Sequence, residues 1–180
     1  MVDLAEIQAA YYMVAATGVL VAAIYYIMSL RNNNKTRQAQ LLNSIQRDIS
    51  DYQGWLRGRE LSYMKWSSYD DFERKYGSDN NPTAYAMRLT NWYWQNNLGV
   101  MLKQRLVDED MVYDTFGSSI IISWIQWETI IKEQRVRYMG PNWMDHFEYL
   151  ANRMKNVQKK RGISWEPKET LLSYVPDAKN

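Results

Sequence analysis

The sequence predicts an all-α protein, with one N-terminal transmembrane helix followed by a helical-bundle domain on the cytoplasmic side. Residues 7–30 contain no Asp, Glu, Lys or Arg, whereas charged residues are frequent in the rest of the chain. Beyond that stretch, apolar residues recur at intervals of three and four, which is the period of one helix face. The chain has no cysteine, which excludes disulfides and is typical of a reducing compartment.

The uncharged stretch from Ile7 to Leu30 has the length of a membrane span. As a helix it would extend about 36 Å, against about 30 Å of bilayer hydrocarbon. Paired tyrosines near both ends suit the two membrane interfaces, and Gly18 with Ala22 forms a small-xxx-small pair that could let two such helices pack. The residues assigned to this anchor are Tyr11, Tyr12, Gly18, Ala22, Tyr25, Tyr26 and Arg31.

The flanks of this stretch indicate an uncleaved anchor and its orientation. A secretory signal would begin with basic residues, but Asp3 and Glu6 precede the span. Arg31, Lys35 and Arg37 follow it, so the positive-inside rule places the N-terminus outside and the remaining chain in the cytoplasm. We therefore expect a single-pass protein of the cell membrane, with the lipid bilayer as its first partner.

Composition and spacing divide the chain into four parts: an anchor (1–30), a juxtamembrane amphipathic helix (31–58), a helical domain (59–162) and a C-terminal tail (163–180). In the second part, the polar residues after Arg31 either loop or continue the anchor helix. An apolar stripe with helical spacing then follows at Leu42, Ile45, Ile49, Tyr52 and Leu56. This stripe predicts a helix that packs on its own domain or pairs with a second copy. The tail is expected to dock or to fold only partly.

Capping signals place the helices of the third part. These signals are Ser68 before and Gly77 after a short helix, Asn81 and Pro82 opening the next, Asp108 and Gly117 bounding a third, and Asn142 with Asp145 opening the last. The segment between Gly117 and Asn142 keeps a helical period despite its run of three isoleucines. Gly99, on the stripe of the second of these helices, predicts a close approach of another helix.

Three polar residues on the apolar stripes form the candidate polar core or pocket. They are Asn96, Glu128 and Arg135. Buried charges are tolerated only when paired, and two helical turns separate Glu128 from Arg135, so each is expected to meet a partner on another helix. The alternative is a ligand-binding pocket that these two residues make with Asn96.

Enzyme and cofactor motifs are absent from the sequence. There is no glycine-rich phosphate loop, no paired-histidine metal helix and no nucleophile elbow, so no catalytic residue, cofactor or metal ligand is assigned. The acidic residues after Asp108 are explained by the start of a helix, because negative charge is favourable at a helix N-terminus. The lone His146 is expected to be a surface or half-buried side chain.

The formal net charge of +2 is too small to predict a nucleic-acid partner. The basic run from Lys155 to Arg161 either complements a helix C-terminus or contacts lipid headgroups.

Several stretches resemble an unannotated family of small prokaryotic, often archaeal, single-span membrane proteins. The resemblance covers most of residues 9–154 and is carried by "AAYYMVAATGVLVAAIYYIMSLR", "NNLGVMLKQRLVDEDMVYDTFG", "WETIIKEQR" and "HFEYLANRM". The positions that match the pattern are Asn97, Gly99, Lys103, Asp108, Tyr113, Asp114, Trp127, Glu128 and Arg135. The resemblance implies the architecture and no activity.

These observations favour a non-enzymatic interaction module, an adaptor or accessory protein at the cytoplasmic membrane face. Its expected partner is another protein or a second copy of the chain. The alternative is a membrane-tethered sensor or enzyme whose polar pocket contains Asn96, Glu128 and Arg135.

Overall fold

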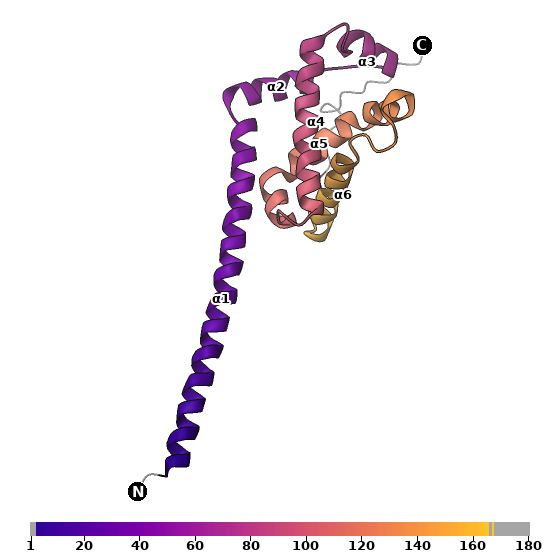
Figure 1. Ribbon diagram of the computed structural model, residues 1–180. Helices are drawn as coiled ribbons and strands as arrows, with labels where there is room; N and C mark the ends of the chain where they lie inside the picture. The colour runs from indigo at the N-terminus through magenta and orange to yellow at the C-terminus, as the bar shows by residue number, and fades with distance from the viewer. Residues whose placement is uncertain (1–2, 166, 168–180) are drawn as a thin grey trace. The chain divides into compact units, whose positions relative to one another are not determined.

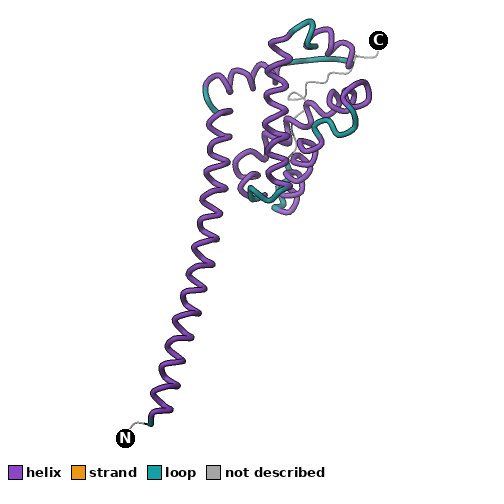
Figure 2. The backbone as a smooth tube through the Cα atoms, in the orientation of Figure 1, coloured by secondary structure: helices purple, strands orange, loops and turns teal. Residues whose placement is uncertain are grey.

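The computed structural model describes residues 3–165 and 167, without the side chain of Asp48, and every regular element in them is helical. The elements are α1 (Leu4–Ile49), α2 (Tyr52–Tyr63), α3 (Tyr69–Tyr76), α4 (Pro82–Lys103), α5 (Glu109–Gln134), the π-helical turn η1 (Arg135–Met139) and α6 (Asp145–Lys160) (Figure 1). Figure 2 shows helices and connecting loops, with no strand in this part of the chain. The predicted all-α class is confirmed. The tail beyond Pro167 lies outside the described residues.

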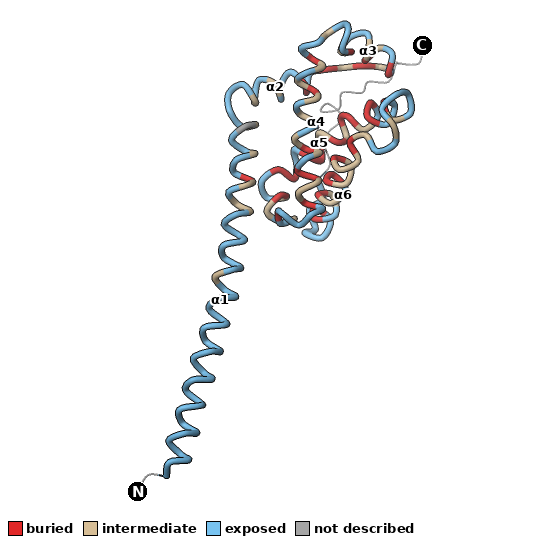
Figure 3. Tube along the Cα trace, in the orientation of Figure 1, coloured by how far each residue is buried: buried red, intermediate tan, exposed pale blue. Residues whose placement is uncertain are grey.

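The chain divides into two compact units between Gln40 and Leu41, and the first unit is the N-terminal part of α1. An apolar window of this helix has a mean hydropathy of 2.0, and none of it is buried (Figure 3). This helix is therefore long and apolar enough to cross a membrane. The polar residues after Arg31 do not form a loop, because α1 continues through them to Ile49.

The second unit begins with the last turns of α1. Leu42 is buried in the core of this unit, and Ile45 and Ile49 pack against that core. Of the two alternatives for the apolar stripe, packing on its own domain is therefore the one observed for these three residues.

The prediction of one amphipathic helix through Leu56 was wrong, because α1 ends at Ile49 and α2 begins at Tyr52. Asp51 caps α2 by accepting a hydrogen bond from Gly54 N at 2.6 Å. A Cβ at Gly54 would lie 2.7 Å from the carbonyl carbon of Ile49, so this turn requires glycine. Beyond the break, Tyr52 faces solvent with 74% of its surface exposed.

The predicted caps of α3, α4 and α5 are confirmed. Ser68 Oγ accepts from Asp71 N at 3.1 Å, and Asn81 Oδ1 accepts from Ala84 N at 3.0 Å. Asp108 Oδ1 accepts from two backbone amides at the start of α5, at 3.0 and 3.1 Å. Because side-chain caps act within three residues, they could be recognised from sequence alone.

Gly117 does not end a helix as expected. The helix α5 runs without a break from Glu109 to Gln134 and joins two segments that the sequence analysis separated. Gly117 is buried, and a Cβ there would lie 2.9 Å from Cε2 of Tyr113. The glycine therefore makes room for a tyrosine ring one turn earlier and does not stop the helix.

The predicted cap of α6 at Asn142 was also wrong. The helix begins at Asp145 after Met144, which has left-handed backbone angles and makes no side-chain cap. The amide of Phe147 instead donates to Asn96 Oδ1 of α4 at 3.1 Å. A side chain 51 positions away in sequence thus satisfies a helix-start amide that a local cap would normally take.

Tryptophan rings fill the centre of the second unit. Trp66 stacks on Trp127 with ring centroids 5.1 Å apart, and Trp92 meets Trp127 edge-on at 5.6 Å. Trp124 packs edge-on against Phe147 of α6 at 5.1 Å. These aromatic side chains are buried, so they serve the core, where such pairs contribute about 0.5–1.5 kcal/mol beyond their buried area.

The close approach predicted at Gly99 is confirmed, because a Cβ there would lie 2.7 Å from the carbonyl carbon of His146. We expect Gly99→Ala to destabilise the second unit by about 1–3 kcal/mol, because the added methyl group overpacks the contact with α6. This loss is expected even though alanine is about 1 kcal/mol more favourable than glycine inside a helix. The control is Asn97→Ala, an exposed site on α4, which should be neutral or slightly stabilising. Thermal melting of the full chain in detergent measures both. Equal melting temperatures for the two variants would contradict the close contact.

Candidate functional site

Two of the three predicted polar residues hold the start of α6. Arg135 Nη1 pairs with Glu148 Oε2 at 2.6 Å, and Arg135 Nε donates to Trp143 O at 2.7 Å. Asn96 accepts from Phe147 N, the residue next to Glu148. Both side chains therefore converge on residues 143–148, where they position a helix that lacks a cap of its own.

Glu128 is not joined to the other two by these bonds. Its carboxylate pairs with Lys132 Nζ at 2.5 Å on the same helix, and this hydrogen bond raises the pKa of Lys132. The expectation of a partner on another helix was wrong for Glu128 and correct for Arg135. The physical reason is the rotation of α5: Trp127 and Ile131 face the core, which leaves Glu128 half-exposed beside them.

We expect Arg135→Gln to destabilise the domain by about 1–3 kcal/mol, because it removes an ion pair and a hydrogen bond at a largely buried site. Glu128→Gln should change stability by about 0.5 kcal/mol or less, as is usual for a solvent-exposed i,i+4 pair. Thermal melting of the full chain in detergent compares them. A larger loss for Glu128→Gln than for Arg135→Gln would contradict the assigned roles.

Arg88 is a fully buried arginine that the sequence analysis missed. Its guanidinium lies over Phe72, Trp92 and Tyr85 with distances to the ring centroids of 4.5, 5.1 and 5.2 Å. Nη1 donates to Tyr76 O, the last carbonyl of α3, at 3.1 Å. Burial lowers the pKa of Arg88 to about 10, so the side chain stays charged at neutral pH. The aromatic faces and the helix C-terminus stabilise this cation.

The burial of Arg88 was not predicted for a simple reason. The buried face of α4 includes Ala84, Arg88, Trp92, Gln95 and Leu98, and Asn96, which was expected on the apolar stripe, is half-buried beside it. Sequence periodicity does not assign arginine to a core, because buried arginine is rare. The neighbouring aromatics at three- and four-residue spacing were the available signal.

A buried amide cluster links α4 to α5. Gln95 is 1% exposed, and its Nε2 donates to Asn91 Oδ1 and to Ser123 Oγ, both at 2.8 Å. Ser123 Oγ also donates to Asn91 Oδ1 at 3.3 Å. Within the described residues, Gln95 Oε1 has no hydrogen-bond partner, which is uncommon for a buried carbonyl.

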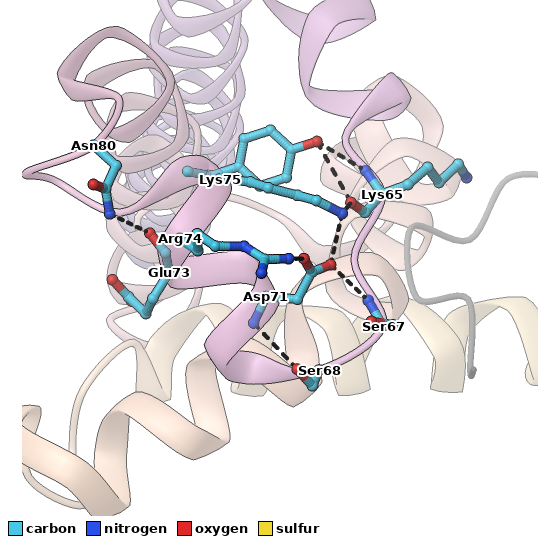
Figure 4. Close-up of polar contacts among 9 residues, drawn as sticks. Lys65, Ser67, Ser68, Asp71, Glu73, Arg74, Lys75 and Asn80 are labelled. Atoms are coloured by element: carbon cyan, nitrogen blue, oxygen red, sulfur yellow. Dashed lines mark hydrogen bonds and ion pairs between the residues drawn. The ribbon is translucent and has the colours of Figure 1, made fainter.

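The start of α3 carries the densest polar network, which is centred on Asp71 (Figure 4). Its carboxylate accepts from Ser67 N at 3.2 Å, from Lys75 Nζ at 2.6 Å and from Arg74 Nη2 at 2.5 Å. The hydrogen bond from Lys75 is the main reason why the pKa of Asp71 is lowered to about 2. The network ties the loop before α3 to the helix.

Acid should weaken this network. Because the folded-state pKa of Asp71 lies below the usual value, its contribution to stability is present above about pH 4 and is lost as the pH falls towards 2. We therefore expect Asp71→Asn to lower the melting temperature at pH 6 and to differ little from wild type near pH 2. Asp79→Asn is the control, since its carboxylate accepts only a local bond from Ser78. A difference between Asp71→Asn and wild type that does not change with pH would contradict this role.

The π-helical turn η1 is bound to α3. Tyr138 donates to Glu73 Oε1 at 3.0 Å, and Tyr69 donates to the same oxygen at 2.7 Å. Burial raises the pKa of both tyrosines, so both hydroxyls remain protonated donors. Arg137 pairs with Asp70 of α3 at 2.9 Å.

The acidic run after Asp108 meets the basic end of α6. Arg161 pairs with Asp110 at 2.8 Å and also with Asp114, and Arg153 pairs with Glu109. Arg161 is therefore engaged in ion pairs within the domain. No group of three His, Asp or Glu side chains that could hold a metal ion occurs among the described residues.

The α2 helix presents large aromatic side chains to solvent. Trp55 and Tyr63 are 70% and 66% exposed, whereas Trp66, Trp92, Trp124 and Trp127 are buried in the core. Both line a groove of about 450 Å³ between α2, α4 and α5. The lining of this groove also includes Asn91 and Ser123 of the amide cluster.

A membrane-length helix joined to a helical domain with a tryptophan core defines the class of this protein. The chain belongs to a family described as a domain of unknown function, DUF4760, whose model matches residues 13–154. The match begins inside the apolar part of α1 and reaches into α6, which confirms the resemblance to an unannotated family. No curated protein and no solved structure shows a significant match to the chain.

Proposed function

We propose that this chain is a single-pass membrane protein that acts by binding, as an adaptor or accessory module at the cytoplasmic face of the cell membrane. The observation that carries the proposal is the uncharged stretch from Ile7 to Leu30, in which every residue except the half-buried Ser29 is exposed. An exposed apolar helix of this length is costly in water and stable in lipid. The lipid bilayer is therefore the first proposed partner.

The charges around the span support the proposed orientation. Asp3 and Glu6 precede it, while Arg31, Lys35 and Arg37 follow it within two helical turns. Basic residues close to a span favour the cytoplasmic side. The N-terminus is therefore proposed to lie outside and the second unit in the cytoplasm.

Binding is favoured over catalysis by how the polar residues are used. Asn96 and Arg135 make bonds that position α6, and Glu128 pairs on its own helix, which weakens the alternative of a sensor or enzyme with a pocket made by these three residues. The aromatic side chains that α2 exposes are typical of an interaction surface, since tyrosine and tryptophan are enriched where proteins bind. A protein partner or a second copy of the chain fits such a surface.

Self-association through the span is supported by Gly18. A Cβ there would meet no atom of this chain within 4 Å, so the glycine is not required by the fold of the first unit. With Ala22 one turn later, it offers a flat face against which a second helix can pack closely.

The absence of cysteine makes single-cysteine variants a direct test of topology. We expect Ala5→Cys to react with a membrane-impermeant maleimide on intact cells, and Asn97→Cys to react only after lysis. The chain should stay in the membrane fraction after alkaline carbonate extraction. Labelling of Asn97→Cys on intact cells, or release by carbonate, would contradict the proposal.

The same set of variants addresses self-association. Gly18→Cys should form a disulfide-linked dimer under mild oxidation in membranes, at a level above that of Leu20→Cys, which lies on the opposite face of the same exposed helix. Equal, low crosslinking at both positions would count against pairing through Gly18.

A further inference from the structure

The groove between α2, α4 and α5 has the size and lining of a small-molecule site. Its volume of about 450 Å³ falls within the range of about 300–1,000 Å³ that is usual for ligand pockets. The lining residues are Trp55, Gly58, Arg59, Leu61, Ser62 and Tyr63 of α2, Asn91 of α4, and Ser119, Ile122, Ser123, Gln126 and Trp127 of α5. All of them lie in the second unit of the chain.

Gly58 is a glycine that folding does not require. It lies inside α2 and lines the groove, yet a Cβ built on it would meet no atom within 4 Å. Gly54 and Gly99, by contrast, each lie where a Cβ would collide with backbone. Glycine costs a helix interior about 1 kcal/mol relative to alanine. Gly58 therefore destabilises α2 without a packing reason in this chain, and its effect is to keep the groove open.

Two aromatic side chains stand at the groove with most of their surface uncovered. Trp55 and Tyr63 flank Gly58 on α2, one turn before and slightly more than one turn after it. Exposed rings of this kind offer faces on which a planar ligand ring can stack, at about 1–3 kcal/mol for a nucleobase. Ile122 and the buried Trp127 give the groove an apolar wall behind them.

Part of the groove lining is polar and incompletely hydrogen-bonded. Asn91 and Ser123 line the groove and bond to Gln95, whose buried Oε1 has no partner among the described residues. Because Gln95 Nε2 already donates to both neighbours, the cluster lacks one donor. A ring N–H or hydroxyl of a ligand at Asn91 and Ser123 would supply a donor and let the amide network rearrange to satisfy Gln95.

One cation lines the groove. The guanidinium of Arg59 lies 5.5 Å from the centroid of the Tyr63 ring, which holds the charge beside an aromatic face. Arg57, two residues earlier, does not line the groove and approaches Asp51 instead. An arginine beside a stacking surface suits a phosphate or carboxylate that is attached to a ring.

We infer that this groove binds a small molecule made of a planar heteroaromatic ring and an anionic group, of which a purine mononucleotide is the representative. The ring stacks on Trp55 or Tyr63 above Gly58, its polar edge meets Asn91 and Ser123, and its anionic group pairs with Arg59. The inference does not rest on membrane insertion, because every residue involved belongs to the second unit.

The test measures binding of adenosine monophosphate, guanosine monophosphate, adenosine and inorganic phosphate to the full chain in detergent by isothermal titration calorimetry. We expect saturable binding of at least one mononucleotide, binding of its nucleoside about tenfold weaker, and no heat from phosphate alone. Gly58→Ala should weaken mononucleotide binding at least about tenfold, because the added methyl group occupies part of the groove against which the ring stacks. Its melting temperature should stay equal or rise, because alanine favours the helix.

Two matched variants distinguish binding in the groove from a general attraction of the anionic ligand to surface arginines. Arg59→Gln should reduce mononucleotide affinity to that of the nucleoside, whereas Arg57→Gln should leave it unchanged. The inference is overturned if neither mononucleotide binds saturably up to about 1 mM. It is also overturned if Gly58→Ala binds as wild type does, or if both arginine variants lose affinity equally. Any of these results leaves the topology experiment with cysteine variants unaffected, so the two proposals fail independently.

Discussion

The start of α6 is the point on which the packing of the second unit depends. This helix has no side-chain cap of its own, and its first turn lies so close to α4 that only glycine fits at position 99. Asn96 supplies the missing acceptor, and Arg135 joins the end of α5 to Glu148. Three helices are therefore fixed at one place by a cap, an ion pair and a backbone contact. Removal of one partner leaves the other polar group without a hydrogen bond, and the free energy of unfolding falls by the cost of that unpaired group.

Around that point, the domain uses polar residues mainly to hold helices together. Arg88 fixes the end of α3 against α4, Asp71 ties the preceding loop to α3, and Arg161 joins α6 to the start of α5. These roles account for charged residues that could otherwise be mistaken for a catalytic set. The exceptions are on α2, where Trp55, Gly58 and Arg59 have little or no role in packing. Because packing does not account for these residues, they are better candidates for ligand contacts than the polar residues that hold helices together.

The two units differ in how they place apolar side chains, and this difference supports the proposed function. The second unit has a core that includes four buried tryptophans, while the apolar window of α1 buries nothing within the chain. Under the proposed function, the apolar helix holds the chain at a membrane, and the second unit binds what reaches it from water. The exposed rings of α2 and the open groove beside them offer such a surface.

Most local features were predictable from the sequence, and contacts between distant residues were not. The apolar span, the helical class, the caps at Ser68, Asn81 and Asp108, and the close approach at Gly99 all follow from neighbouring residues or from composition. The break at Asp51 and the continuation of α5 through Gly117 involve residues within five positions along the chain, but the helix period alone did not reveal them. The missing cap of α6 depends on an atom placed by the tertiary fold. The burial of Arg88 was decided in the same way, because a helix period fixes which residues share a face but not the rotation of that face towards the core. The sequence by itself determined the apolar span, the helical class and the capped starts of α3, α4 and α5. Only the tertiary structure decided which polar side chains of different helices meet, since those bonds join residues far apart in the chain.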